Sequence, residues 1–143
     1  MSVRQISVFI ENRKGSLVAL TRLLKRKNID LIALSIADAE HYGILRCITT
    51  DLDASVTAMR EAGYTVKLTD VLAVCVEDKP GGLSDILELL SARDISVEYL
   101  YSFVRTTGDR AIIILHLSDL QAARGALAEH GIRMLEQDQV RAL

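Results

Sequence analysis

The chain has 143 residues, half of them hydrophobic and a quarter charged, which is the composition of a globular protein and not of a disordered one. A formal net charge of −2 and a pI near 5.9 give no sign of a protein that binds a polyanion such as a nucleic acid. No apolar stretch approaches membrane-spanning length, and residues 1–5 lack the apolar core of a signal peptide. We therefore expect a cytoplasmic protein that has no membrane partner.

Two cysteines, Cys47 and Cys75, lie inside apolar, strand-like runs. Neither belongs to a CxxC motif or has a histidine nearby, so buried free thiols are the first interpretation and a disulfide is the alternative. The three histidines have no metal-ligand spacing. The sequence therefore predicts no metal and no cofactor.

The first half of the chain alternates strand and helix patterns. Apolar residues alternate along the strand-like segments, whereas leucines recur at helical spacing between them. The cap residue Asp51 begins the second helix and Gly63 ends it. Strands are predicted at 6–10, 29–39, 44–50 and 64–68, and the first helix at 18–27, with a hairpin turn at 40–43.

The second half repeats the first. A shift of 66 positions lays Gly15 on Gly81, and after two extra residues in a second hairpin at 106–109, a shift of 68 lays Gly63 on Gly131. An internal repeat that preserves caps, glycines and core leucines indicates two copies of one unit. We place the two domains at 1–70 and 71–143, with Thr69-Asp70 as the only break between them. No flexible linker separates them, so we expect them to pack as one rigid unit.

Each half is expected to be a ferredoxin-like βαββαβ domain, which makes the chain an α+β protein with antiparallel sheets and both helices on one face of each sheet. A domain of this size buries only a modest core, so we expect the halves, or two chains, to cover each other's exposed edges and faces. Alternate residues of 95–103 form an apolar face that is predicted to be core, although Tyr101 suits a ligand or subunit contact equally well.

Both halves open with a strand that turns on glycine into a helix, at 11–17 and at 77–83. Such a turn directs unpaired backbone N–H groups into one small space, which suits an anion such as a carboxylate. A simple turn without a ligand is the alternative. Asn12 and Asp78 stand at the mouths of the two loops, where a helix cap or an Asx-turn is as reasonable as a ligand contact.

At Asp78-Lys79-Pro80-Gly81-Gly82-Leu83 the chain resembles the ACT domain family, whose opening motif is strand, D-x-P-G-x-L, helix. The first copy departs from the motif, because Asn12 replaces the acid and Lys14 replaces the proline. The resemblance covers essentially the whole chain as two tandem copies. It implies a non-catalytic regulatory protein that binds a free amino acid at domain interfaces, as a homodimer or a larger homo-oligomer.

The resemblance also implies where the amino acid binds. The glycine loops would hold its carboxylate, an oxygen at the loop mouth would meet its ammonium group, and backbone groups of the second strands would complete the site. The implied ligand-binding residues are Asn12, Gly15, Ser16, Leu17, Ser35 and Ile36 in the first half, and Asp78, Gly81, Gly82, Leu83, Tyr101 and Ser102 in the second. No catalytic residue is implied.

Two other functions were weighed. The same topology serves RNA-recognition modules, but these need exposed aromatic residues on the central strands, and the third strands at 44–50 and 111–117 contain none. No nucleic-acid partner is therefore expected. The motifs of common hydrolases and phosphate-binding enzymes are absent from the sequence, so we do not expect an enzyme. The remaining alternative is an interaction subunit that docks on a metabolic enzyme without binding a small ligand.

Overall fold

The computed structural model describes residues 2–38, 40–103, 108 and 110–143. Its elements follow the expected order of strands and helices, twice over, with one further helix at the end. The first half contains β1 (Val3–Glu11), α1 (Ser16–Arg26), β2 (Leu31–Asp38), β3 (Tyr42–Thr49) and α2 (Leu52–Glu61), and β4 (Thr65–Glu77) passes into the second. The second half continues with α3 (Gly82–Ala92), β5 (Val97–Ser102), β6 (Arg110–Leu117), α4 (Leu120–Glu129), β7 (Met134–Leu135) and α5 (Gln137–Arg141).

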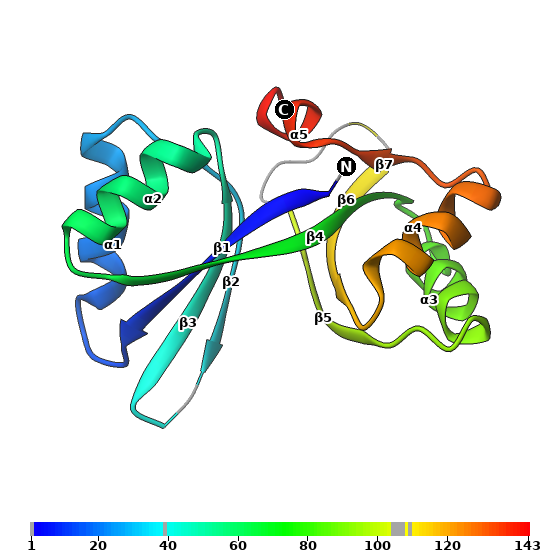
Figure 1. Ribbon diagram of the computed structural model, residues 1–143, viewed down its shortest axis with the longest axis horizontal. Coiled ribbons are helices and arrows are strands. Elements are labelled where there is room, and N and C mark those ends of the chain that lie inside the picture. The colour runs from blue at the N-terminus through cyan, green and yellow to red at the C-terminus, as the bar shows by residue number, and fades with distance from the viewer. Residues whose placement is uncertain (1, 39, 104–107, 109) are drawn as a thin grey trace.

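The two halves have the same antiparallel strand order. It is β2-β3-β1-β4 in the first half and β5-β6-β4-β7 in the second, so each later strand takes the place of its repeat counterpart. Helices α1 and α2 lie at one end of the molecule and α3 and α4 at the other, with the sheets between them (Figure 1). The α+β class and the tandem ferredoxin-like architecture predicted from the sequence are confirmed.

One strand belongs to both sheets. The sequence predicts a break at Thr69-Asp70, yet β4 runs without interruption over 13 residues. The reason is pairing: Thr69 and Asp70 lie opposite Gln5 and Arg4 of β1, and an Arg4–Asp70 ion pair of 3.8 Å joins the side chains. The first part of β4 completes the first sheet, and the last part pairs with β6 and β7 in the second. The proposed domain boundary therefore falls inside a continuous strand.

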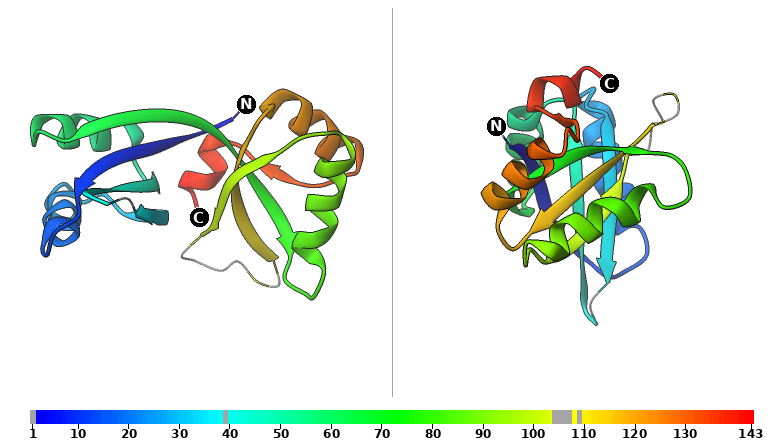
Figure 2. Two further views of the ribbon diagram at one scale, coloured as in Figure 1. Left: turned by 90° about the horizontal axis from the view of Figure 1, so that it is seen from below. Right: turned by 90° about the vertical axis from the view of Figure 1, so that its right-hand side faces the viewer.

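The described part of the chain forms three apolar clusters. One lies beneath α1 and α2, and a second lies beneath α3 and α4. The third lies between the two halves, where the sheet faces turned away from the helices meet, as the views in Figure 2 show. The edge strands β2 and β5 also meet there through a bridge between Ala33 and Phe103. This inter-half core consists of Val3, Ile32, Ala33, Ile48, Val71, Ala73, Tyr101, Phe103, Ile112, Ile114, Leu135 and Val140.

The predicted apolar face of residues 95–103 is divided between two cores. A register shift between Val97 and Tyr99 turns the strand, so that Ile95 and Val97 face the helices while Tyr101 and Phe103 enter the inter-half core. Tyr101 and Phe103 are each only 7% exposed, and Tyr99 is half-buried beside them. The prediction of core was right, but the prediction of a single face was wrong, because a bulge changes the side to which later residues point.

A polar layer lines part of the inter-half contact. Gln5 is fully buried; its Nε2 donates to the Tyr99 hydroxyl at 2.8 Å, and its Oε1 accepts from the Tyr101 hydroxyl at 2.7 Å. The Arg46 guanidinium lies 3.8 Å from the centre of the Tyr99 ring, whose other neighbour is the stacked imidazole of His116, with centroids 4.8 Å apart. The contacts of Gln5 and Arg46 join β1 and β3 of the first half to β5 of the second, so they fix one half against the other.

The end of the chain was not anticipated. The fourth strand of the second half is only the two-residue β7, and the short α5 follows it. A reciprocal capping box between Glu136 and Gln139 begins α5, and its Val140 is fully buried in the inter-half core. The second hairpin, predicted at 106–109, lies outside the described residues except for Gly108.

Candidate functional site

The two loops have the same backbone conformation at their matching glycines, Gly15 and Gly81. Gly15 precedes α1 with φ 90° and ψ −10°, and Gly81 precedes α3 with φ 89° and ψ −11°. This left-handed conformation strains any residue with a side chain, which explains why both copies keep glycine there. The first turns of α1 and α3 therefore begin at matching points, with their N–H groups directed toward the loops.

A pocket of about 270 Å³ lies between the first loop and the edge strand β2. We call it the loop pocket. It brings together four residues predicted from the sequence, namely Asn12, Ser16, Leu17 and Ile36. Its remaining lining is Ile10, Glu11, Arg13 and Gly43. Gly15 helps to form it indirectly, by setting the turn from which Ser16 and Leu17 extend.

An ion pair stands at the mouth of the loop pocket. The Arg13 Nε lies 2.8 Å from the Glu11 carboxylate, and both side chains are largely exposed. The second half repeats the pair, with Lys79 Nζ 2.6 Å from Glu77. There the hydrogen bond from Lys79 and its positive charge lower the pKa of Glu77. A carboxylate and a cation side by side are complementary to the two charged ends of a zwitterion.

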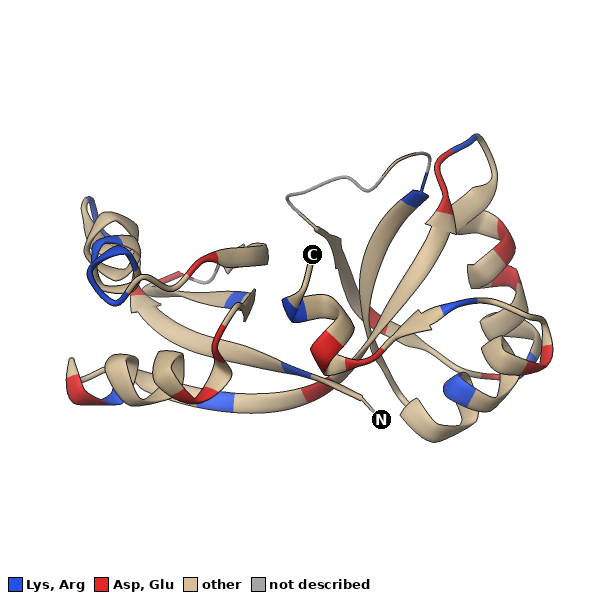
Figure 3. Cartoon of the chain, turned by 90° about the horizontal axis from the view of Figure 1, so that it is seen from above, with Lys and Arg blue, Asp and Glu red and all other residues tan. Residues whose placement is uncertain are grey.

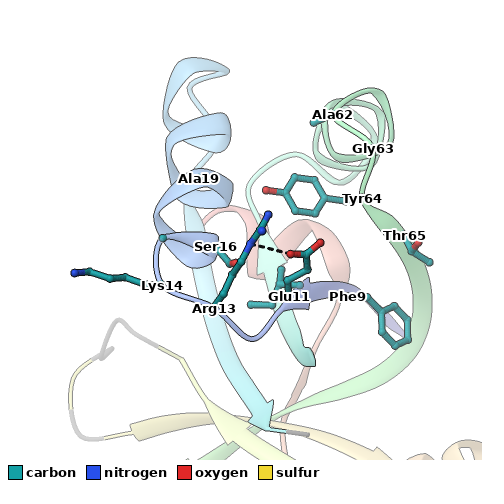
Figure 4. Close-up of a pocket in the computed structure, with 12 residues that line it drawn as sticks. Phe9, Glu11, Arg13, Lys14, Ser16, Ala19, Ala62, Gly63, Tyr64 and Thr65 are labelled. Carbon is teal, nitrogen blue, oxygen red and sulfur yellow. Dashed lines mark ion pairs between the residues drawn. The ribbon is translucent and has the colours of Figure 1, made fainter. Parts of the chain in front are cut away.

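A larger pocket of about 580 Å³ lies on the other side of the same loop, between α1 and α2 (Figure 4). Arg13, Glu11 and Ser16 border both pockets, while Tyr64 and Phe9 line only the larger one. Its repeat counterpart, of about 390 Å³, lies between α3 and α4.

The surroundings of the two loops differ in charge. Arg13, Lys14 and the basic end of α1 lie in the first half, whereas α3 of the second half carries the acidic residues Asp85 and Glu88 (Figure 3). In the pocket between α3 and α4, Asp85 takes the place that Ala19 has in the first half. The second-half pocket nevertheless contains two cations of its own, Lys79 and Arg110.

The other predicted residues are more dispersed. Ser35 lies opposite Arg46 in the sheet, so its side chain points to the other face from that of Ile36. Tyr101 is committed to the inter-half core, so only its backbone is left for a ligand. In the second half Asp78, Gly81 and Ser102 are exposed, whereas Leu83 is half-buried against the core beneath α3.

Glycine is needed at position 82 for a structural reason that is independent of any ligand. It is buried, and a Cβ atom added there would overlap the carbonyl oxygen of Glu77. The loop thus closes onto its own backbone at this point. The first copy carries Ser16 at the matching position, so the two loops differ locally although their helices begin alike.

Sequence reasoning missed four lining residues of the loop pocket. Glu11 and Arg13 form an acid–x–base pattern that recurs at Glu77 and Lys79, and this repetition was a usable signal. Gly43 was assigned to a hairpin turn, yet it is a buried residue of β3 that pairs with Ile10 of β1. Ile10 and Gly43 could be placed beside the pocket only once the pairing of β1 with β3 was known.

Within the described residues, no three His, Cys, Asp or Glu side chains converge in a way that could hold a metal ion. None of the described helices is long and apolar enough to cross a membrane. Residues 44–50 contain no aromatic side chain, but β3 begins before them at Tyr42, whose exposed ring lies 5.9 Å from that of Phe9.

The comparisons with known proteins agree with this architecture. The family model described as "ACT domain pair" matches residues 1–143. The crystal structure of protein BT0572 from Bacteroides thetaiotaomicron is similar with 32% identity and a TM-score of 0.93, over 100% of this chain and 98% of that one. The regulatory subunit of aspartate kinase from Thermus thermophilus, in its ligand-free form, has 13% identity and a TM-score of 0.66, over 90% and 91% of the two chains. The Thermus flavus regulatory subunit has 14% identity and a TM-score of 0.62, over 90% and 92%.

At such low identity the two kinase subunits show a shared fold alone. Among curated proteins the chain finds no match. The family model, by contrast, spans both glycine loops, both sheets and the strand that joins them. The chain therefore belongs to the ACT domain pair family.

Proposed function

We propose that the chain is a non-catalytic regulatory protein that binds a free amino acid in the loop pocket of its first half. The observation that carries this proposal is the loop pocket itself, a small hollow with apolar walls and a Glu11–Arg13 pair at its mouth. Small-ligand sites commonly combine an apolar lining with a few converging polar groups.

The charges suit both ends of an amino acid. Its carboxylate would lie near Arg13 and the first turn of α1, where the helix dipole contributes about 0.3–1 kcal/mol at an exposed site. Its ammonium group would approach Glu11 and the oxygens of Asn12. Binding would exchange the Glu11–Arg13 contact, which is 2.8 Å long and largely exposed, for two contacts with the ligand.

A second copy of the chain would close the pocket. Three large apolar side chains around it are exposed, Leu17 by 38%, Val18 by 49% and Ile36 by 47%. They lie on α1 and on the edge strand β2, and exposed apolar side chains next to an open strand edge favour association. We propose a homodimer or larger homo-oligomer in which this surface lies at the interface.

The second loop is a weaker candidate for the same role. Asp78, Gly81 and Leu83 keep the family pattern, but Asp85 lines the neighbouring pocket where the first half has Ala19, which opposes the ligand's carboxylate. We propose the first-half loop pocket as the main site. The stoichiometry of binding, measured by calorimetry, shows whether the second-half site is occupied as well.

The test is a thermal-shift screen of the purified protein against the twenty amino acids, followed by calorimetry. A saturable ligand at 100 times its dissociation constant should stabilise the protein by about 2.7 kcal/mol. Gly15→Val should abolish this shift, because the side chain is strained at φ 90°. The matched control is Gly131→Val, also at positive φ but outside both glycine loops, which should lower the melting temperature yet keep the shift.

A different outcome would favour the second candidate. If no amino acid shifts the melting temperature, the exposed Leu17, Val18 and Ile36 surface remains the main unexplained feature. The chain would then be a subunit that docks on a metabolic enzyme without a small ligand. Loss of a co-purified enzyme on Val18→Glu would support that function.

A further inference from the structure

We infer that the loop pocket selects an amino acid with an apolar, aliphatic side chain, and that Gly43 determines this selection by leaving the floor of the pocket open. The inference rests on the proposed function, since it names the class of ligand for the same site. It is carried by three features: the space above Gly43, the apolar walls, and the different residues at the matching positions of the second half.

The glycine at position 43 provides space and is not needed for a special backbone conformation. Its φ is not in the positive range, unlike those of Gly15 and Gly63. A Cβ atom placed there would lie 3.5 Å from both Ile10 Cγ1 and the carbonyl oxygen of Ala37, and 3.7 Å from Ile36 Cγ2, which is ordinary van der Waals contact. The missing side chain therefore leaves a recess about the size of a methyl group between two isoleucines.

The walls around this recess are apolar and partly unburied. Ile10 is 8% exposed, whereas Leu17 is 38% and Ile36 47% exposed. An aliphatic ligand side chain that enters the recess would remove this surface from water, which is favourable in proportion to the area covered. A charged side chain would instead lose its hydration against the isoleucines, with the carbonyl oxygen of Ala37 as the polar atom at the floor.

The charged groups of the pocket lie at its mouth. The Glu11 and Arg13 side chains are 68% and 74% exposed, and each has the other as its partner. They can therefore contact the ammonium and carboxylate groups common to all amino acids, but they do not distinguish one ligand side chain from another. Selection is left to the floor, where Ile10, Ile36 and Gly43 meet.

The second half supplies a natural comparison. The pair Ile10–Gly43 of the first sheet corresponds to Val76–Ala111 of the second, and both pairs lie in register between matching strands. Ala111 places a methyl group where Gly43 leaves space, and Ser102 stands at the position of Ile36. The same change made in the first half should therefore convert its floor to that of the second.

The experiment is titration calorimetry of the full chain with alanine, valine, leucine, isoleucine, lysine and glutamate. The wild type should bind the branched aliphatic amino acids best. Gly43→Ala should weaken the largest aliphatic ligand by roughly tenfold or more and alanine much less, since one methylene in an apolar pocket is worth about 10–200-fold. Ile36→Ser should weaken the aliphatic ligands without improving lysine or glutamate. Ala111→Gly in the second half is the matched control and should leave first-half affinity unchanged.

The outcomes separate the inference from the function on which it rests. If the wild type binds none of the twenty amino acids, the proposed function fails. If it binds lysine or glutamate best, or if a folded Gly43→Ala keeps the affinities of the wild type, the inference fails while the proposed function stands. Circular dichroism decides whether Gly43→Ala folds, and the exposed Ile36→Ser carries the test if it does not.

Discussion

At the scale of single residues, the glycines of this chain serve different physical ends. Gly15 and Gly81 provide a left-handed turn, Gly43 leaves space beside a pocket, and Gly82 allows a loop to close on its own backbone. The sequence could predict the first of these, because the repeat sets Gly15 on Gly81 before a helix. It could not predict the role of Gly82, since its repeat partner is Ser16 and the close contact exists only in the folded loop.

The proposed role of Gly82 can be tested by comparing it with Gly125. Both are helical, but a Cβ at Gly82 would overlap the Glu77 carbonyl oxygen, whereas a Cβ at Gly125 has nothing within 4 Å. Gly82→Ala should therefore destabilise the protein, by about 1–3 kcal/mol as for other overpacked sites. Gly125→Ala should stabilise it by about 0.5–1 kcal/mol, because alanine loses less entropy in a helix.

Urea unfolding followed by far-UV circular dichroism measures both changes. The two substitutions add the same methyl group, so helix propensity alone would make them shift the midpoint in the same direction. Equal stabilisation by Gly82→Ala would show that the loop does not close as described.

At the scale of elements, the repeat made the helices α1 to α4 predictable, but not α5, and the strands only in part. The positions of α2 and α4 follow from local caps: Asp51 accepts from the Ala54 N–H and Asp119 from the Ala122 N–H, each at 3.0 Å. Strand limits follow from partners distant in the sequence. The turn-like Thr69-Asp70 is extended because β1 pairs with it, and no local pattern reveals that pairing.

The duplicated caps predict equal effects in the two halves. Asp51→Ala and Asp119→Ala should each cost about 1 kcal/mol, because each removes the acceptor of an N–H at the start of a helix. Their near-identical backbone angles, with φ −141° in both, make the two caps geometrically equivalent. Urea unfolding measures the loss, and the exposed Glu88→Ala on α3 is the control, with no change expected beyond a few tenths of a kcal/mol. Unequal losses would mean that the halves do not share their stability.

At the scale of the whole molecule, the tandem architecture could be predicted, but the way in which the two halves pack against each other could not. Repetition and the absence of a linker indicate two packed domains. The contact itself depends on which sheet faces meet. The bridge between Ala33 and Phe103, for example, joins residues about 70 positions apart in the chain. The same limit applies to the loop pocket, since its floor is formed by β1, β2 and β3 together.

The role of α5 tests whether the halves unfold together. Val140 of this helix is fully buried in a core built from both sheets. Val140→Asp places a carboxylate there without a partner, and burying an unpaired charge is among the changes that cost several kcal/mol. Because β4 and the inter-half core belong to both halves, we expect the first half to lose stability as well, although Val140 lies at the far end of the sequence.

Cys47 reports on the first half independently. It is fully buried beneath α1 and α2, and burial raises the pKa of its thiol to about 12, so that the reactive thiolate is scarce at pH 8 until that core opens. In a Cys75→Ala background, labelling of Cys47 at low urea should become many times faster with Val140→Asp. The exposed Ala142→Asp, on the same helix end, should leave the rate unchanged. If Val140→Asp lowers the overall helix signal while Cys47 stays protected, the two halves unfold separately, and the continuous strand does not couple them.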